Sequence, residues 1–269
     1  MNRRVWCGFV LTILSALTVR AQQQATAYAS TSCVKVQPGK AAEFAKFQND
    51  VEKKIVQLQA DEGEIASRFL SQTLFPGGEE ARCNYIVFTS YSGIPPVPAP
   101  EHLTSLLKKA GVGLTSDAYF AKTAEVERTI SVEMFRQIVL IGNVQKGDYI
   151  YLNFMKVHDL PGYLDFERTI YKPVAEGFME DGTFHAWIVL QSFLPGGTGL
   201  PYQAISADIF PSWEKAIKGD NAAEMYKKVH PNLDQQEIHD RLVKLRDLDH
   251  RYLVVVQDVT VPSTKAAKP

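Results

Sequence analysis

The chain has 269 residues, of which 45% are hydrophobic and 22% are charged, and its formal net charge is −1 at pH 7. The charges are scattered without a lysine or arginine block, which excludes the basic surface typical of a protein that binds nucleic acid. The length suits one large domain or two small ones.

The chain starts with features of a secretory signal peptide. Arg3 and Arg4 precede an apolar run from Val5 to Val19, and small or modest residues follow as far as Ala21. A membrane anchor is the alternative, but the run is shorter than the roughly 20 residues that span a bilayer. We therefore expect residues 1–21 to be cleaved and the product to be periplasmic or secreted, with no membrane attachment afterwards. Cleavage would leave 26 basic and 30 acidic residues.

A similar nine-residue motif occurs twice, as "LSQTLFPGG" at 70–78 and as "VLQSFLPGG" at 189–197. The segments around it also match: 30–47 and 151–166 each read as an alternating strand, a Pro-Gly or Leu-Pro-Gly break and an amphipathic helix. A returning strand, a helical region and a last strand follow in both halves. Each half thus reads strand, helix, strand, turn, strand, helix, strand, which is the order of a ferredoxin-like unit.

This order predicts the domain boundaries. The first ferredoxin-like repeat covers 28–141, a short polar linker covers 142–147, and the second repeat covers 148–261. We expect the tail at 262–269 to be flexible.

A single ferredoxin-like sheet has helices on one face and an apolar face left bare, and its twin is the obvious partner. The predicted fold class is therefore α+β, with two tandem ferredoxin-like β-α-β-β-α-β repeats whose sheets pack into an α+β barrel. The element order and the repeated Pro-Gly-Gly turn resemble the dimeric α+β barrel superfamily, with both copies fused. Relatives of that fold include cofactor-independent monooxygenases, isomerase-like degradative enzymes, and haem enzymes such as chlorite dismutases and dye-decolourising peroxidases.

Strand alternation predicts which side chains face the barrel. In the second strand of repeat two, the apolar side chains on one face are Phe184, Ala186, Ile188 and Leu190. We expect this face to pack under the helices. The alternate residues of the strand would then point into the barrel, together with polar neighbours on adjacent strands. The predicted ligand-binding residues are His185, Trp187, Gln191, Tyr151, Asn153 and Asp208, with Arg68 and Gln72 at matching positions of repeat one.

Apolar walls with a few convergent polar groups are typical of a small-molecule site. Each candidate also has a plain structural interpretation: His185 as a satisfied core histidine, Trp187 as packing, and Asp208 as the partner of Arg68 or another cation. No serine-nucleophile elbow, phosphate-binding loop or Cys-x-x-Cys motif is present.

Three functions stay open at this point. The first is an exported protein that binds a small, partly apolar molecule in the barrel. The second is an enzyme, either similar to cofactor-free monooxygenases or haem-dependent with His185 as the iron ligand. The third is a structural or partner-binding module with a filled interior. No cofactor is predicted apart from the haem alternative, and the oligomeric state is open.

Cys33 and Cys83 are the two cysteines of the mature chain. An oxidising compartment permits a disulfide between them. Both fall in strands that are expected to be neighbours, although the register offsets them by about three residues. A bridge and two separate buried thiols are both compatible with this pattern.

Overall fold

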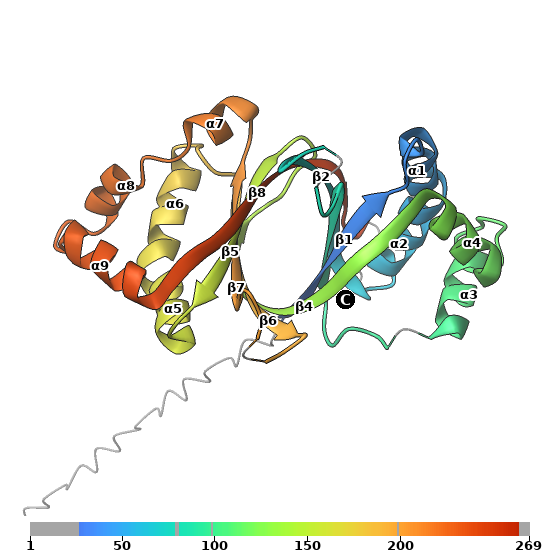
Figure 1. Ribbon diagram of the computed structural model, residues 1–269, viewed down its shortest axis with the longest axis horizontal. Coiled ribbons are helices and arrows are strands. Elements are labelled where there is room, and N and C mark those ends of the chain that lie inside the picture. The colour runs from blue at the N-terminus through green and yellow to red at the C-terminus, as the bar shows by residue number, and fades with distance from the viewer. Residues whose placement is uncertain (1–26, 79–80, 98, 198, 264–269) are drawn as a thin grey trace, which may run out of the picture.

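The computed structural model describes residues 27–78, 81–97, 99–197 and 199–263 (Figure 1). The predicted signal peptide lies outside the described residues, as do residues 264–269 of the predicted tail. Within these ranges, no helix is both long enough and apolar enough to cross a membrane.

The first half of the chain contains four strands and two helical regions. In chain order the elements are β1 (Ala27–Val36), α1 (Ala41–Phe47), the π-helical turn η1 (Gln48–Glu52), α2 (Lys53–Asp61), β2 (Ile65–Phe75), β3 (Tyr85–Tyr91), α3 (Pro100–Lys109), α4 (Ser116–Val126) and β4 (Glu127–Gly142).

The second half follows the same order with an additional helix. Its elements are β5 (Tyr149–Val157), α5 (Leu160–Phe166), the π-helical turn η2 (Glu167–Tyr171), α6 (Lys172–Glu180), β6 (Ala186–Leu194), β7 (Ala204–Phe210), α7 (Trp213–Lys218), α8 (Ala222–Val229), α9 (Gln235–Leu245) and β8 (Arg246–Thr260).

The described strands close into one barrel in the order β1-β3-β2-β8-β5-β7-β6-β4. Every neighbouring pair is antiparallel. Strands from different halves meet at two places, β2 beside β8 and β4 beside β6. Helices α1–α4 flank one side of the barrel and α5–α9 flank the other (Figure 1). The prediction of a mixed helix-and-strand fold built on a barrel is confirmed.

Helices α2 and α6, which precede β2 and β6, end in the same way. Gly63 follows α2 and Gly182 follows α6, both with positive φ (80° and 72°). Their amides donate to Ala60 and Met179, and the amide of the next residue donates to a carbonyl five residues back. This is the Schellman ending, in which glycine takes the left-handed conformation without a Cβ penalty.

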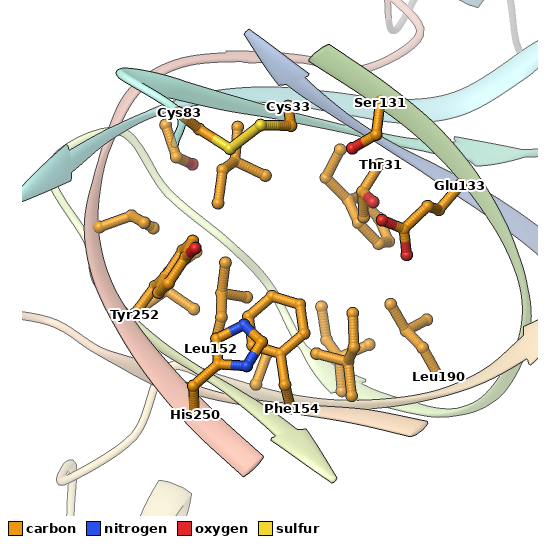
Figure 2. A pocket seen from close by; sticks show the side chains of 18 of the residues that line it. Thr31, Cys33, Cys83, Ser131, Glu133, Leu152, Phe154, Leu190, His250 and Tyr252 are labelled. Carbon is orange, nitrogen blue, oxygen red and sulfur yellow. A yellow bond between two sulfur atoms is a disulfide. The ribbon is translucent and has the colours of Figure 1, made fainter. Parts of the chain in front are cut away.

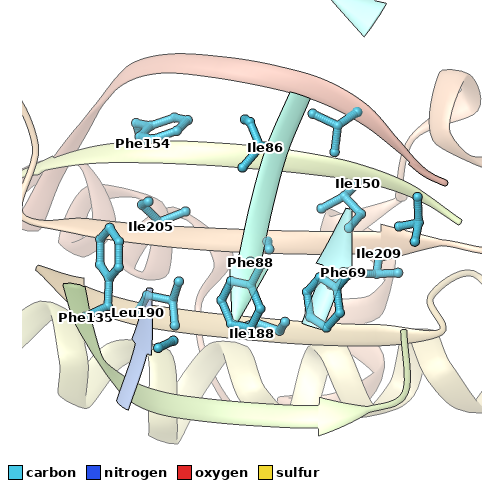
Figure 3. Packing of buried hydrophobic residues seen from close by; sticks show 14 of the residues in the cluster. Phe69, Ile86, Phe88, Phe135, Ile150, Phe154, Ile188, Leu190, Ile205 and Ile209 are labelled. Atoms are coloured by element: carbon cyan, nitrogen blue, oxygen red, sulfur yellow. The ribbon is translucent and has the colours of Figure 1, made fainter. Parts of the chain in front are cut away.

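The apolar core of the barrel lies inside the ring of strands (Figure 3). Phe69 and Phe88 of the first half stack there, with ring centroids 4.6 Å apart. Facing them are aliphatic side chains of the second half, among them Ile188, Leu190 and Ile205. Burying one such side chain contributes about 1.5–3 kcal/mol, so this cluster is a major source of stability.

The predicted orientation of the second-half strands was wrong by one residue. Ala186, Ile188 and Leu190, expected under the helices, belong to the cluster inside the barrel. Trp187 and Val189, expected inside the barrel, pack instead with α6. Alternation failed to orient the strand because both faces are buried: all seven residues of β7 and the first five of β6 are inaccessible. A one-residue shift then exchanges the two faces completely.

The structure joins Cys33 to Cys83 in a disulfide, with a Cα–Cα distance of 5.3 Å. Cys33 is paired in register with Ile86, three residues beyond Cys83. The chain before β3 nevertheless turns back along β1, because the amide of Asn84 donates to the carbonyl of Val34 at 2.8 Å. That bond brings the two Cα atoms within the range that a disulfide requires.

Candidate functional site in the barrel lumen

The lumen of the barrel contains a cavity (Figure 2). The centre of a water-sized sphere can move through about 60 Å³ of it. One water needs roughly 10–15 Å³ by the same measure, so the space exceeds that of a single water several times. Most of its wall is apolar, and the second half contributes Leu152, Phe154, Ile188, Leu190 and Ile205 to it.

Polar side chains enter the lumen mainly from the first half. Thr31 of β1 is paired in register with Glu133 of β4, and Cys33 is paired with Ser131. Because alternate residues of a strand share a face, Ser131 and Glu133 project to the same side of β4. Figure 2 shows Thr31 and Glu133 on the side of the cavity opposite Phe154 and Leu190. The lumen therefore has a polar wall at Thr31 and Glu133, whereas Phe69, Ile86 and Phe88 of the first half add to its apolar lining.

Glu133 accepts a hydrogen bond from the hydroxyl of Tyr202. Tyr202 precedes β7 and is 7% exposed. Burial, followed by the hydrogen bond to Glu133 and the charge of that residue, raises the pKa of Tyr202 well above its ordinary value. Tyr202 therefore keeps its proton and donates it in this hydrogen bond, and Glu133 is the acceptor.

The ring of Tyr202 belongs to a group of four rings. The ring of Phe154 stacks on His250 at a centroid distance of 4.1 Å and meets Tyr202 edge-on at 4.8 Å. Tyr252 lies 5.4 Å from Phe154 and 5.1 Å from His250. All four residues line the cavity. Such a group offers aromatic faces to a bound molecule and holds its own rings in fixed positions.

Two further groups complete the lining. The Cys33–Cys83 disulfide contributes both of its residues to the wall. Arg82 also lines the cavity, but it lies between β2 and β3 and is exposed to solvent. Nδ1 of His250 lies 2.6 Å from the carboxylate of Asp249, and Asp249 itself does not line the cavity.

Four of the eight predicted site residues do come together, but on the helix side of the second-half sheet. Asp208 is paired in register with both Tyr151 and Trp187. Asn153 donates to Asp208 at 2.8 Å and accepts from Nε of Arg251, whose guanidinium lies 4.9 Å from the centre of the Tyr151 ring. This polar group therefore lies between sheet and helices, and the prediction that it faces the lumen was wrong.

The environment of that polar group is strongly desolvated. Burial raises the pKa of Asp208 to about 6, and the charge of Asp220 acts in the same direction, while the bond from Asn153 opposes it. Burial likewise raises the pKa of Glu167, in η2, to about 7. Trp187 is fully buried, and its indole N–H has no partner among the described residues. Asp208 is not paired with Arg68, which was one structural interpretation of the sequence.

The other four predicted residues are dispersed. His185 precedes β6, and its Nδ1 lies 2.9 Å from the Asp148 carboxylate. Gln191 lies at the β4–β6 contact, opposite Arg136. Arg68 donates to Gln48 of η1 at 3.3 Å, and Gln72 accepts from Gln257 at 3.2 Å. None of these residues lines the lumen cavity, so the structure gives them no common site, and a ligand role for the eight residues stays a prediction.

The haem alternative names His185 as the iron ligand. His185 does not line the lumen cavity, so it is not placed to bind a haem there. In the described part of the chain, no three His, Cys, Asp or Glu side chains are grouped to hold a metal ion.

Sequence reasoning missed the residues that give the lumen its chemistry: Thr31, Ser131, Glu133, Tyr202, His250 and Tyr252. One signal was available for β4, because Ser131, Glu133 and Phe135 alternate with outward residues, one of which, Val132, is 57% exposed. His250 belongs to β8. Its strand begins several residues earlier than its apolar run suggests.

Comparison with known proteins supports the fold. No protein-family model matches the sequence, and no curated protein matches it. A candidate monooxygenase of known structure from Fusobacterium nucleatum subsp. nucleatum superposes with a TM-score of 0.55, at 8% identity, over 88% of this chain and 95% of its own. A candidate monooxygenase from Lactobacillus acidophilus gives 0.52, at 10% identity, over 88% and 96%. Identities this low show that this chain shares their fold, and no more.

Proposed function

We propose that the protein binds a small, largely apolar molecule in the barrel lumen. The observation that carries this proposal is the two-sided cavity, with aliphatic residues of the second half facing Thr31, Ser131 and Glu133 of the first. Apolar walls bury most of a ligand, and a few polar groups fix its orientation. Glu133 is half-buried and has the Tyr202 hydroxyl as its hydrogen-bond donor, which leaves acceptor positions of its carboxyl group for a ligand.

We further infer that the chain consists of two tandem ferredoxin-like repeats, at 28–141 and 148–261. The strand orders β4-β1-β3-β2 and β8-β5-β7-β6 support this inference. So do the π-helical turns η1 and η2, which occur at the same place in each half. The Schellman endings at Gly63 and Gly182 are a third correspondence. On this interpretation the lumen is the surface along which the repeats pack together.

Saturation-transfer difference NMR with 2-phenylethanol tests the binding proposal. The aromatic protons of the alcohol should receive saturation from the wild-type protein, and Ala207→Phe, which fills the cavity, should abolish the effect. Ile188→Trp fills the same space from a neighbouring strand and covers the case in which one variant fails to fold. Val132→Phe is the matched control, because Val132 lies between two lumen residues of β4 but is exposed. Equal saturation in all four proteins would overturn the proposal.

An enzyme of the cofactor-free monooxygenase type is the second candidate. Both solved structures described above are candidate monooxygenases, and a carboxylate, a tyrosine and a histidine border this cavity. A carboxylate or imidazole beside a bound substrate can accept a proton from it. Oxygen consumption matched by loss of a phenolic substrate, without added flavin or metal, would favour this candidate. Such consumption should decrease in Glu133→Gln.

Export is also part of the proposal. The apolar leader before Ala21 supports it, and the Cys33–Cys83 disulfide is of the kind that persists in an oxidising compartment.

A further inference from the structure

We propose that the lumen selects molecules with a protonated amine at one end of an apolar body, and that Glu133 binds the amine. This inference rests on the proposed function, since it names the class of ligand for the same cavity. It depends on the charge, the hydrogen bonds and the aromatic neighbours of Glu133.

The carboxylate of Glu133 has an incomplete set of partners. Tyr202 donates to its Oε2. No ion pair among the described residues involves Glu133. A carboxylate has about four acceptor positions, and a charge that faces an apolar wall is costly unless it is paired. An ammonium group would supply both a positive charge and three N–H donors.

The neighbours of Glu133 also suit an ammonium group. The hydroxyls of Thr31 and Ser131 lie on the same wall and can accept hydrogen bonds. The ring of Tyr202, whose hydroxyl donates to Glu133, lines the cavity, and it meets the ring of Phe154 edge-on at a centroid distance of 4.8 Å. Aromatic faces carry negative charge density and attract a cation. The apolar body of the ligand would then lie against the aliphatic wall of the second half.

Two other lining side chains bear on this selection. Arg82 is exposed and lies outside the strands, but its positive charge reaches the Tyr202 hydroxyl, where it acts to lower the pKa. His250 lies against the carboxylate of Asp249. Glu133 projects from a strand of the barrel wall and is half-buried, so its charge acts on the lumen through a less polar medium.

Three probes with the same phenylethyl body test the inference: 2-phenylethylamine, 2-phenylethanol and 3-phenylpropionate. Their dissociation constants should be measured at pH 7 by NMR titration. A hydrogen bond to a charged partner predicts that the amine binds about tenfold more tightly than the alcohol. The carboxylate probe should bind most weakly, because its charge repels Glu133.

Variants identify the responsible group. Glu133→Gln should weaken amine binding about tenfold, to the level of the alcohol. Asp258→Asn is the matched control, since it removes an equal charge from the outer part of β8, where Asp258 pairs with Lys53; amine binding should stay the same. The preference for the amine should persist in Arg82→Ala.

Each other outcome has a distinct meaning. If none of the probes binds, the proposed function fails and this inference fails with it. If the alcohol binds as tightly as the amine, the lumen is a binding site but the inference is wrong. If 3-phenylpropionate binds most tightly and loses that affinity in Arg82→Ala, then Arg82 is the selecting group.

Discussion

Replacing Asp208 by asparagine should change the pH dependence of stability. Asp208 is buried on the helix side of β7, and burial raises its pKa from 3.8 to about 6. A raised pKa means that the folded state holds the proton more tightly than the unfolded state. The stability that this proton provides is fully present below pH 3.8 and is lost as the pH rises through about 6.

The size of the effect follows from the two pKa values. Between pH 4.5 and pH 8, wild-type Asp208 loses about 2 kcal/mol of this favourable contribution. Asparagine does not titrate, and its side-chain oxygen can still accept the bond from Asn153. The unfolding free energy of Asp208→Asn minus that of the wild type should therefore rise by about 2 kcal/mol from pH 4.5 to pH 8.

Urea unfolding at both pH values measures this difference. Glu214→Gln is the control of opposite sign, because Lys218 lowers the pKa of the exposed Glu214 carboxylate. Glutamate at that position stabilises the fold above its unfolded pKa, and this benefit disappears on acidification. The Glu214→Gln difference should thus fall slightly, not rise, towards pH 8. An Asp208→Asn difference that is constant across this range would refute the desolvated environment described for the polar group.

Further perturbations test other parts of the structure. Trp187→Ala should cost about 3–5 kcal/mol of unfolding free energy, as for a buried aromatic side chain. Trp213 is 43% exposed, so Trp213→Ala should cost much less. Equal losses in thermal unfolding would contradict the helix-side packing of Trp187. Replacing Cys33 and Cys83 together by serine should cost about 2–4 kcal/mol, since the bridge closes a loop of 50 residues, and unchanged stability would argue against the bridge. N-terminal sequencing of exported protein should begin near Gln22, and a start at Met1 would exclude cleavage.

The sequence predicted the barrel because its information is periodic and repeated. The matching phrases at 70–78 and 189–197, each following a strand, were enough to place eight strands in two similar sets. The sequence did not decide whether the disulfide forms, because the strand register separates the two cysteines by three residues. The path of the chain at Asn84 brings them together, and no strand pattern reveals that path.

The site was not predictable in the same way. Alternation sorts side chains into two faces but does not say which face is the lumen when both are buried, as they are in β6 and β7. Polarity was the deciding criterion, and it misled, because Asp208 and Asn153 are satisfied by each other and by Arg251 on the helix side. The polar wall of the lumen came from the first half, through Glu133, whose partner Tyr202 lies 69 residues away.

A crystal structure of the protein with 2-phenylethylamine tests most directly whether the lumen is the binding site. Ligand density is expected inside the barrel, with the nitrogen within hydrogen-bonding distance of the Glu133 carboxylate and the ring against Leu152 and Ile188. A ligand found beside Trp187, between the sheet and α6, or a lumen filled by side chains with no ligand in it, would contradict the claim that the lumen is the binding site.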